Sequence, residues 1–138
     1  MEKVMTQVGE FLNALFNEDD LVEVRMLPSG KRDWRKIKSF TQEFLDELKH
    51  ANLDGQNIYF GANPRTRKGS SNTDVAMCQC LFVDFDNVSI DYARKIISSG
   101  SLPLPTVEVA SGHGVHFYCV VLLLYVKATI RLKTPQEL

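Results

Sequence analysis

The amino-acid sequence predicts an α+β protein. Three observations support this class: a helical spacing of apolar residues over 3–16, alternation of apolar and polar residues over 21–27, and an order of strand, helix, strand and strand from residue 80 onward. The chain has 138 residues, 44% hydrophobic and 24% charged, which is an ordinary soluble composition with enough chain for one core. We therefore expect a single domain over residues 1–138.

The first elements are a helix and a hairpin. Residues 3–16 place six apolar side chains on one face of a helix: Val4, Val8, Phe11, Leu12, Leu15 and Phe16. Alternation over 21–27 predicts a half-buried strand, with Val22, Val24 and Met26 against Glu23 and Arg25. The turn signal Pro28-Ser29-Gly30 follows, and residues 33–40 can return as the hairpin partner.

A second helix and a third strand complete this half. The helix starts after Ser39 or Thr41, either of which can cap it, and ends at the turn signal of residues 52–55. Residues 57–63 follow as a strand and lead into a basic loop. Together these elements predict an N-terminal helix/strand unit.

The C-terminal half predicts a sheet with one crossover helix. Its elements are a strand over 80–86, a helix over 90–98 capped by Ser89, and strands over 106–110 and 115–124. The last two strands are separated by Ser-Gly-His-Gly, which predicts a hairpin. This order is the first part of a split β-α-β-β-α-β unit. The segment from Lys127 has no clear pattern.

Charge and cysteine content restrict the class of protein. The net charge is −1, so the overall charge of the chain does not favour binding to nucleic acid or to a membrane. Electrostatic attraction to such a partner would have to come from a local cluster of charged residues. The longest apolar run, Cys119–Val126, is far shorter than the roughly 20 residues that a membrane helix needs. Cys78, Cys80 and Cys119 are an odd number of cysteines, which favours a reducing, cytoplasmic setting, and we interpret Cys78 and Cys80 as small buried side chains on a strand.

Two aspartates end the apolar strand over 80–86. Asp84 and Asp86 are two residues apart, so both carboxylates point to one face of the strand. Such a pair can share divalent metals, and Mg²⁺ or Mn²⁺ prefer oxygen ligands and complete their shells with substrate phosphates. The alternative is that the acids only end the strand and cap the following turn.

The hairpin and the basic loop contain the other candidate binding residues. Gly112 and Gly114 allow close approach of the backbone to phosphate oxygens, with Ser111 beside them, and His116 begins the next strand. A lone histidine there is also compatible with a structural role. In the basic loop, Arg65 follows the strand end and is our candidate for binding a triphosphate or a template backbone. A solvated surface loop is the alternative for Arg67 and Lys68.

In combination, these motifs resemble a known family. An apolar strand ending in Asp-x-Asp, followed after residues 87–110 by Ser-Gly-x-Gly-x-His, resembles motifs I and II of the archaeo-eukaryotic primase superfamily. The similarity is closest to the replication primases and primase-polymerases of plasmids and phages, and it spans Leu15–Tyr118. It implies an N-terminal unit packed on an incomplete RRM-like (β-α-β-β) catalytic core.

The resemblance also implies an activity, a metal and partners. The activity is template-directed nucleotidyl transfer in DNA replication of a mobile element, with Mg²⁺ or Mn²⁺ as cofactor. Asp84 and Asp86 match the metal-binding acids, and His116, with Ser111 beside it, matches the histidine that contacts the nucleotide phosphates. The implied partners are a single-stranded DNA template, nucleoside triphosphates, and a helicase or a further replication domain, without a membrane.

The family carries a third acidic residue on a later strand. Here 20 residues follow Tyr118, and Glu137 is the sole acid among them. We therefore expect the C-terminal part of the core to be missing after motif II, or to be supplied by another chain. A catalytically incomplete nucleotide- or nucleic-acid-binding remnant of a primase is the main alternative to the enzyme.

Two other enzymes share parts of the pattern. A metal-dependent nuclease could use the same acids with His116 as general base. The Asp-x-Asp motif also fits haloacid-dehalogenase-like phosphatases, with Asp84 as nucleophile and Asp86 as acid/base. That class needs further residues over a long Rossmann-like core and leaves the glycine-rich hairpin unexplained.

Overall fold

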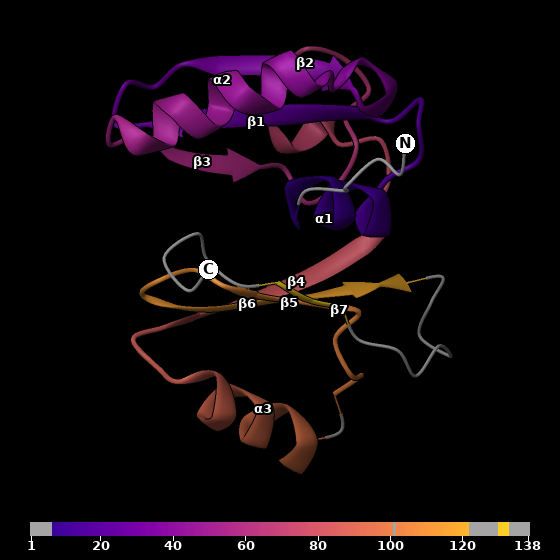
Figure 1. The fold of residues 1–138 in the computed structure, drawn as a ribbon. Coiled ribbons are helices and arrows are strands. Elements are labelled where there is room, and N and C mark those ends of the chain that lie inside the picture. The colour runs from indigo at the N-terminus through magenta and orange to yellow at the C-terminus, as the bar shows by residue number, and fades with distance from the viewer. Residues whose placement is uncertain (1–6, 101, 122–129, 133–138) are drawn as a thin grey trace, which may run out of the picture. The chain divides into compact units, whose positions relative to one another are not determined.

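The computed structural model describes residues 7–100, 102–121 and 130–132. The chain forms two compact units (Figure 1). We name them the β1 unit, Leu15–Cys78, and the β4 unit, Met1–Ala14 with Gln79–Leu138. The expected α+β class is confirmed, because each unit combines helix with sheet. The expectation of a single domain depends on how the two units are joined, and it stays a prediction.

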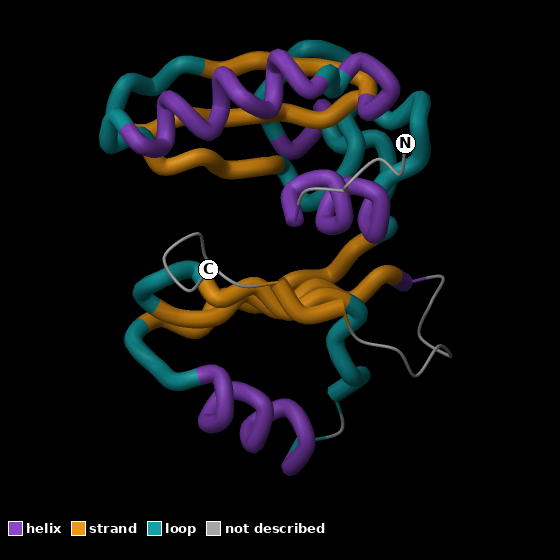
Figure 2. The backbone as a smooth tube through the Cα atoms, viewed as in Figure 1, coloured by secondary structure: helices purple, strands orange, loops and turns teal. Residues whose placement is uncertain are grey.

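The β1 unit is a three-stranded antiparallel sheet with one helix on it (Figure 2). Its elements are β1 (Leu21–Leu27), β2 (Arg32–Lys36), a short 3-10 helix (Ile37–Ser39), α2 (Gln42–Leu53), β3 (Asn57–Phe60) and a second 3-10 helix (Asn72–Asp74). The strand order is β2-β1-β3, so β2 lies at an edge. Val24 and Met26 of β1 pack against Phe44 and Leu48 of α2 to form the core.

Local sequence signals account for the boundaries of α2. The hydroxyl of Thr41 accepts a hydrogen bond from the backbone N–H of Phe44 at 3.2 Å, which caps the first turn. Gly55 has a φ of +92°, a conformation that favours glycine, and its N–H bonds to the carbonyl of Asn52 just after the helix. The predicted helix, its cap at Thr41 and its stop are therefore confirmed.

The β4 unit is a four-stranded sheet with a helix on one face (Figure 1). Its elements are α1 (Gln7–Leu15), β4 (Cys80–Asp86), α3 (Ile90–Ser99), β5 (Val107–Ala110), β6 (Gly114–Val120) and β7 (Ile130–Leu132). The last residue of α1, Leu15, belongs to the β1 unit. The strand order is β4-β6-β5-β7, with β7 parallel to β5 and the other pairs antiparallel. The predicted hairpin is confirmed as β5 and β6.

One face of this sheet is covered by α3. Ala93 and Ile97 of the helix pack against Val115 and Phe117 of β6, with Phe85 of β4 at the margin. The hydroxyl of Ser89 caps α3 by accepting from the N–H of Tyr92 at 3.1 Å, as the sequence predicts. Because side chains alternate along a strand, the residues between these core positions lie on the opposite face.

Several apolar side chains of β4 lie at the surface, and one cysteine differs from its expected burial. β4 is an edge strand, and Leu81, Phe82 and Val83 are 53%, 61% and 39% exposed. Cys80 is buried as expected, but Cys78 is exposed, so the expectation of a buried side chain is wrong for Cys78. β6 ends at Val120, and the rest of the strand expected to residue 124 lies outside the described residues. In the described part of the chain, no helix has the length and apolarity that crossing a bilayer requires.

Candidate active site

The two aspartates of β4 lie on the face of the sheet opposite α3. Asp84 and Asp86 alternate with Phe85, whose ring contacts Phe117 on the α3 side. The side chain of Asp84 is 48% exposed, and Asp86 is exposed as well. Both carboxylates are therefore accessible from one face of a hydrogen-bonded strand.

His116 lies directly across from Asp84. The two residues are register partners in the β4–β6 pairing, and the Nε2 atom of His116 is 3.2 Å from Oδ1 of Asp84. This contact unites residues from the two motifs that the sequence places far apart along the chain. The structure thus brings three of the predicted site residues to the same face of two neighbouring strands.

Tyr118 follows His116 by two residues on β6 and lies on the same face of the sheet. Its hydroxyl is 3.5 Å from Nδ1 of His116, and its ring packs on Phe11 of α1 and Phe82 of β4. Burial, with smaller effects of Cys80 and Asp84, raises the pKa of Tyr118 to about 12. The hydroxyl therefore stays protonated at neutral pH and can donate to Nδ1, which leaves Nε2 of His116 to donate to Asp84.

The glycine-rich turn lies at the end of β4. Gly114 is the register partner of Asp86, and a Cβ on Gly114 would be 1.9 Å from the carbonyl oxygen of Phe85. Gly112 has a φ of +90°, and Ser111 closes the turn by donating its N–H to the carbonyl of Gly114 at 3.0 Å. The backbone requires glycine at both positions.

A second contact holds this turn against β4. The N–H of Asn87, directly after Asp86, donates to the carbonyl of His113 at 2.7 Å. The candidate phosphate-binding residues Ser111, Gly112 and Gly114 are consequently fixed beside the carboxylates. The arrangement depends on backbone hydrogen bonds, which favour a rigid site.

The same face can accept a divalent cation. Asp84 and Asp86 supply hard oxygen donors, as Mg²⁺ and Mn²⁺ prefer, and they are solvent-accessible. Within the described ranges, no group of three or more His, Cys, Asp or Glu side chains could hold a metal ion. A cation held by these two carboxylates would take its other ligands from water or substrate, so the donor set fits a substrate-completed site. Glu137 lies outside the described residues.

Arg65 belongs to the β1 unit. Its guanidinium contacts Oε2 of Glu23 at 2.9 Å and donates to the carbonyl of Ser71 at 2.9 Å, and its side chain is 13% exposed. Glu23 also accepts from Ser70 at 2.8 Å. The structure thus shows a role for Arg65 in fixing the basic loop on β1, whereas its contact with nucleotide stays a prediction.

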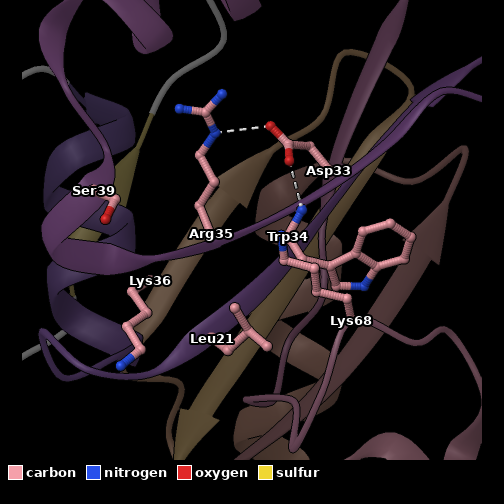
Figure 3. A pocket seen from close by; sticks show the side chains of 7 residues that line it. All are labelled: Leu21, Asp33, Trp34, Arg35, Lys36, Ser39 and Lys68. Carbon is pink, nitrogen blue, oxygen red and sulfur yellow. Dashed lines mark hydrogen bonds and ion pairs between the residues drawn. The ribbon is translucent and has the colours of Figure 1, made fainter.

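The structure also contains a pocket outside the predicted site residues. It has a volume of about 440 Å³, opens to solvent at the edge strand β2, and is lined by Trp34, Arg35, Lys36, Ser39, Lys68 and Asp33 (Figure 3). The sequence feature that could have indicated this pocket is the run Lys31–Lys38, in which five of eight residues are basic and surround the sole tryptophan.

Comparisons of the chain with protein-family models, with curated proteins and with solved structures found no match. A functional assignment therefore depends on the residues and on their geometry.

Proposed function

We propose that this chain is a template-directed nucleotidyltransferase of the primase-polymerase type, acting in plasmid- or phage-type DNA replication. One observation carries the proposal. Asp84 and His116, which come from the Asp-x-Asp and Ser-Gly-x-Gly-x-His motifs, are register partners 3.2 Å apart, with Asp86 opposite Gly114. The two motifs on which the resemblance depends thus form one surface.

The topology of the β4 unit supports an RRM-like core. Strands β4, β5 and β6 have the spatial order β4-β6-β5, and α3 is the crossover between β4 and β5. This is the arrangement of a split β-α-β unit followed by a hairpin. β7 pairs with β5 rather than with β4, and in this pairing the sheet departs from a split β-α-β-β-α-β unit.

Each residue at the site has a role in this proposal. Asp84 and Asp86 would hold Mg²⁺ or Mn²⁺, which when bound would neutralise phosphate charge and stabilise the attacking and leaving oxygens. His116 would turn its Nε2–H from Asp84 to a phosphate oxygen of the incoming nucleotide. Ser111 and the backbone around Gly112 and Gly114 would position the triphosphate.

The reaction is the joining of two nucleotides on a single-stranded template. A 3′-oxygen forms a bond to the α-phosphorus of a nucleoside triphosphate while the bond to the leaving pyrophosphate breaks. The rigid pairing of β4 with β6 contributes by holding donors and carboxylates in place before substrate arrives, which lowers the entropic cost of alignment.

The antiparallel sheet gives no support to the phosphatase alternative. That class needs a Rossmann-like sheet with the motif at the end of a parallel strand, and β4 pairs antiparallel with β6. The nuclease and the nucleotide-binding remnant would use the same surface as the primase. An activity assay distinguishes these three functions.

The decisive assay is incorporation of labelled ATP or dATP on a single-stranded DNA template with Mn²⁺. We compare the wild type with Asp84→Asn/Asp86→Asn, and use Asp91→Asn, an exposed aspartate of α3, as the matched control. Product from the wild type and from Asp91→Asn, but not from the double variant, supports the enzyme. Absence of product from folded wild-type protein that binds nucleotide supports the remnant, and degradation of the template without nucleotides supports a nuclease.

A further inference from the structure

The pocket at β2 has a local charge opposite to that of the whole chain. Arg35, Lys36 and Lys68 contribute three cations to its lining and Asp33 one carboxylate, a balance of +2, whereas the chain carries −1. In Figure 3 the side chains of Arg35 and Lys36 point in opposite directions, as expected for successive residues of a strand. The pocket is therefore an electropositive site at the edge of the sheet.

The single carboxylate of the pocket is already engaged. Asp33 accepts from Nε of Arg35 at 2.8 Å and from the backbone N–H of Trp34 at 2.8 Å. Burial alone would raise the pKa of Asp33, but these hydrogen bonds and the charges of Arg35 and Lys68 lower it below its ordinary value. The carboxylate is thus ionised and paired with Arg35, so Lys36 and Lys68 supply the charge available to a ligand.

The other contacts of these cations leave them accessible. Lys36 is 52% exposed and lies 4.0 Å from Asp19, which Lys38 also contacts. Arg35 is held by Asp33 and by its position 3.8 Å over the ring of Phe44. The Arg35 side chain is consequently fixed, while the lysine side chains can reach an anion.

Trp34 provides an aromatic surface in the same pocket. Its indole N–H donates to the carbonyl of Gly69 at 3.2 Å, which fixes the ring against the loop that carries Lys68. The residue is half-buried and lines the pocket (Figure 3). Lysines on an edge strand also prevent pairing between sheet edges, but that role alone requires no aromatic ring among them.

We propose that this pocket binds single-stranded DNA, with a base stacked on Trp34 and backbone phosphates on Lys36 and Lys68. Basic grooves with aromatic side chains bind single strands in this manner, and the stacking tolerates any base. An open site at a sheet edge admits a continuous strand. The proposal is independent of the metal chemistry on β4 and goes beyond the proposed function by assigning the strand to residues of the β1 unit.

The experiment uses Trp34 as its own reporter, since it is the sole tryptophan of the chain. We titrate the protein with oligo-deoxythymidylate of about 12 nucleotides and follow tryptophan fluorescence, together with the anisotropy of a labelled oligonucleotide. Binding should quench the fluorescence and weaken with salt. In Lys36→Ala/Lys68→Ala, the slope of log affinity against log salt should fall by about 1.4, because two phosphate contacts are lost.

Matched variants separate this site from general electrostatics and from unfolding. Lys49→Ala/Lys95→Ala removes two exposed helical lysines, produces the same change in net charge, and should leave the salt slope unchanged. Trp34→Ala should weaken binding about tenfold, and Trp34→Phe, which retains a ring, should restore most of the affinity. Circular dichroism verifies that each variant is folded.

Three outcomes would overturn the proposal. These are equal affinity of Lys36→Ala/Lys68→Ala and wild type, an equal loss in the Lys49→Ala/Lys95→Ala control, and quenching of Trp34 by ATP alone with no response to the oligonucleotide. Asp84→Asn/Asp86→Asn should bind the oligonucleotide as the wild type does. Strand binding that persists without any nucleotide incorporation would therefore retain this inference while rejecting the proposed function.

Discussion

Two acidic residues within strands have opposite surroundings. Glu23 in β1 is 3% exposed and contacts Arg25 at 3.0 Å, Arg65 at 2.9 Å and Ser70 at 2.8 Å. Asp84 in β4 is 48% exposed, and among the described residues its ion-pair partner is His116. The protein supplies the counter-charges of Glu23 itself, whereas Asp84 and its neighbour Asp86 can receive a cation from outside. The comparison indicates that Glu23 serves the fold and that the aspartates serve a ligand.

The largest expected effect is on activity at the aspartates. Asp84→Asn and Asp86→Asn should each lower Mn²⁺-dependent nucleotide incorporation by about 100-fold, because each removes a charged oxygen ligand worth several kcal/mol of charge stabilisation. Neither should lower the free energy of unfolding, since both side chains are exposed and like-charge repulsion is relieved. Initial rates and urea unfolding measure the two effects. A loss of stability in either variant would mean that the aspartates serve the fold as Glu23 does.

Glu23 should show the reverse pattern. Glu23→Ala leaves Arg65, at 13% exposure, without its carboxylate partner, and breaking such a buried pair costs about 3 kcal/mol. Trp34 is the register partner of Glu23, so its fluorescence during urea unfolding reports directly on this part of the sheet. The control Glu47→Ala, an exposed residue of α2, should stay within about 0.5 kcal/mol of wild type. Equal stability of the two variants would reject the structural role of Glu23.

The same pair should make the β1 unit sensitive to acid. Burial alone would raise the pKa of Glu23, but hydrogen bonds from Ser70 and Arg25 and the charge of Arg65 lower it below its ordinary value of 4.5. A pKa lowered in the folded state contributes stability above the ordinary value, and this contribution is lost as the pH falls through the folded pKa. Urea midpoints should therefore fall below about pH 4.5 in the wild type and less steeply in Glu23→Gln. Parallel profiles would contradict the assignment.

Local sequence patterns predict the ends of the helices, but they do not predict the burial of Glu23. Thr41, Gly55 and Ser89 have local roles, and their positions predict where helices begin and end. The alternation in β1 predicts an outward Glu23, yet the structure buries it. Its partners Arg65 and Ser70 come from a loop some forty residues later, and no pattern within the strand indicates their approach.

The order of the strands in the sheet is a second feature that the sequence does not predict. The apolar residues of β4 give no indication that the strand lies at an edge, so the exposure of Leu81 and Phe82 depends on pairing that only the fold shows. The proximity of Asp84 to His116 is likewise a consequence of register across β4 and β6. The pocket around Trp34 was not expected, because its members are brought together from β2 and from the loop at Lys68.

The smallest expected effect tests whether Tyr118 orients His116. Tyr118→Phe retains the ring that packs on Phe11 and Phe82 but removes the hydroxyl that lies 3.5 Å from Nδ1 of His116. A long, partly buried hydrogen bond of this kind is worth about 0.5–1 kcal/mol, which corresponds to a two- to fivefold decrease in nucleotide incorporation. Initial rates measure the decrease, and an unchanged unfolding midpoint excludes a packing defect.

A tautomer measurement separates orientation from other causes of such a small decrease. The raised pKa of Tyr118 keeps its hydroxyl protonated, so it donates to Nδ1 and favours the tautomer in which Nε2 of His116 carries the proton toward Asp84. Nitrogen-15 NMR of the ring should show this tautomer in the wild type and a larger share of the other one in Tyr118→Phe. A lower rate with an unchanged tautomer ratio would contradict the orienting role of Tyr118, and Asp84 alone would then orient the imidazole.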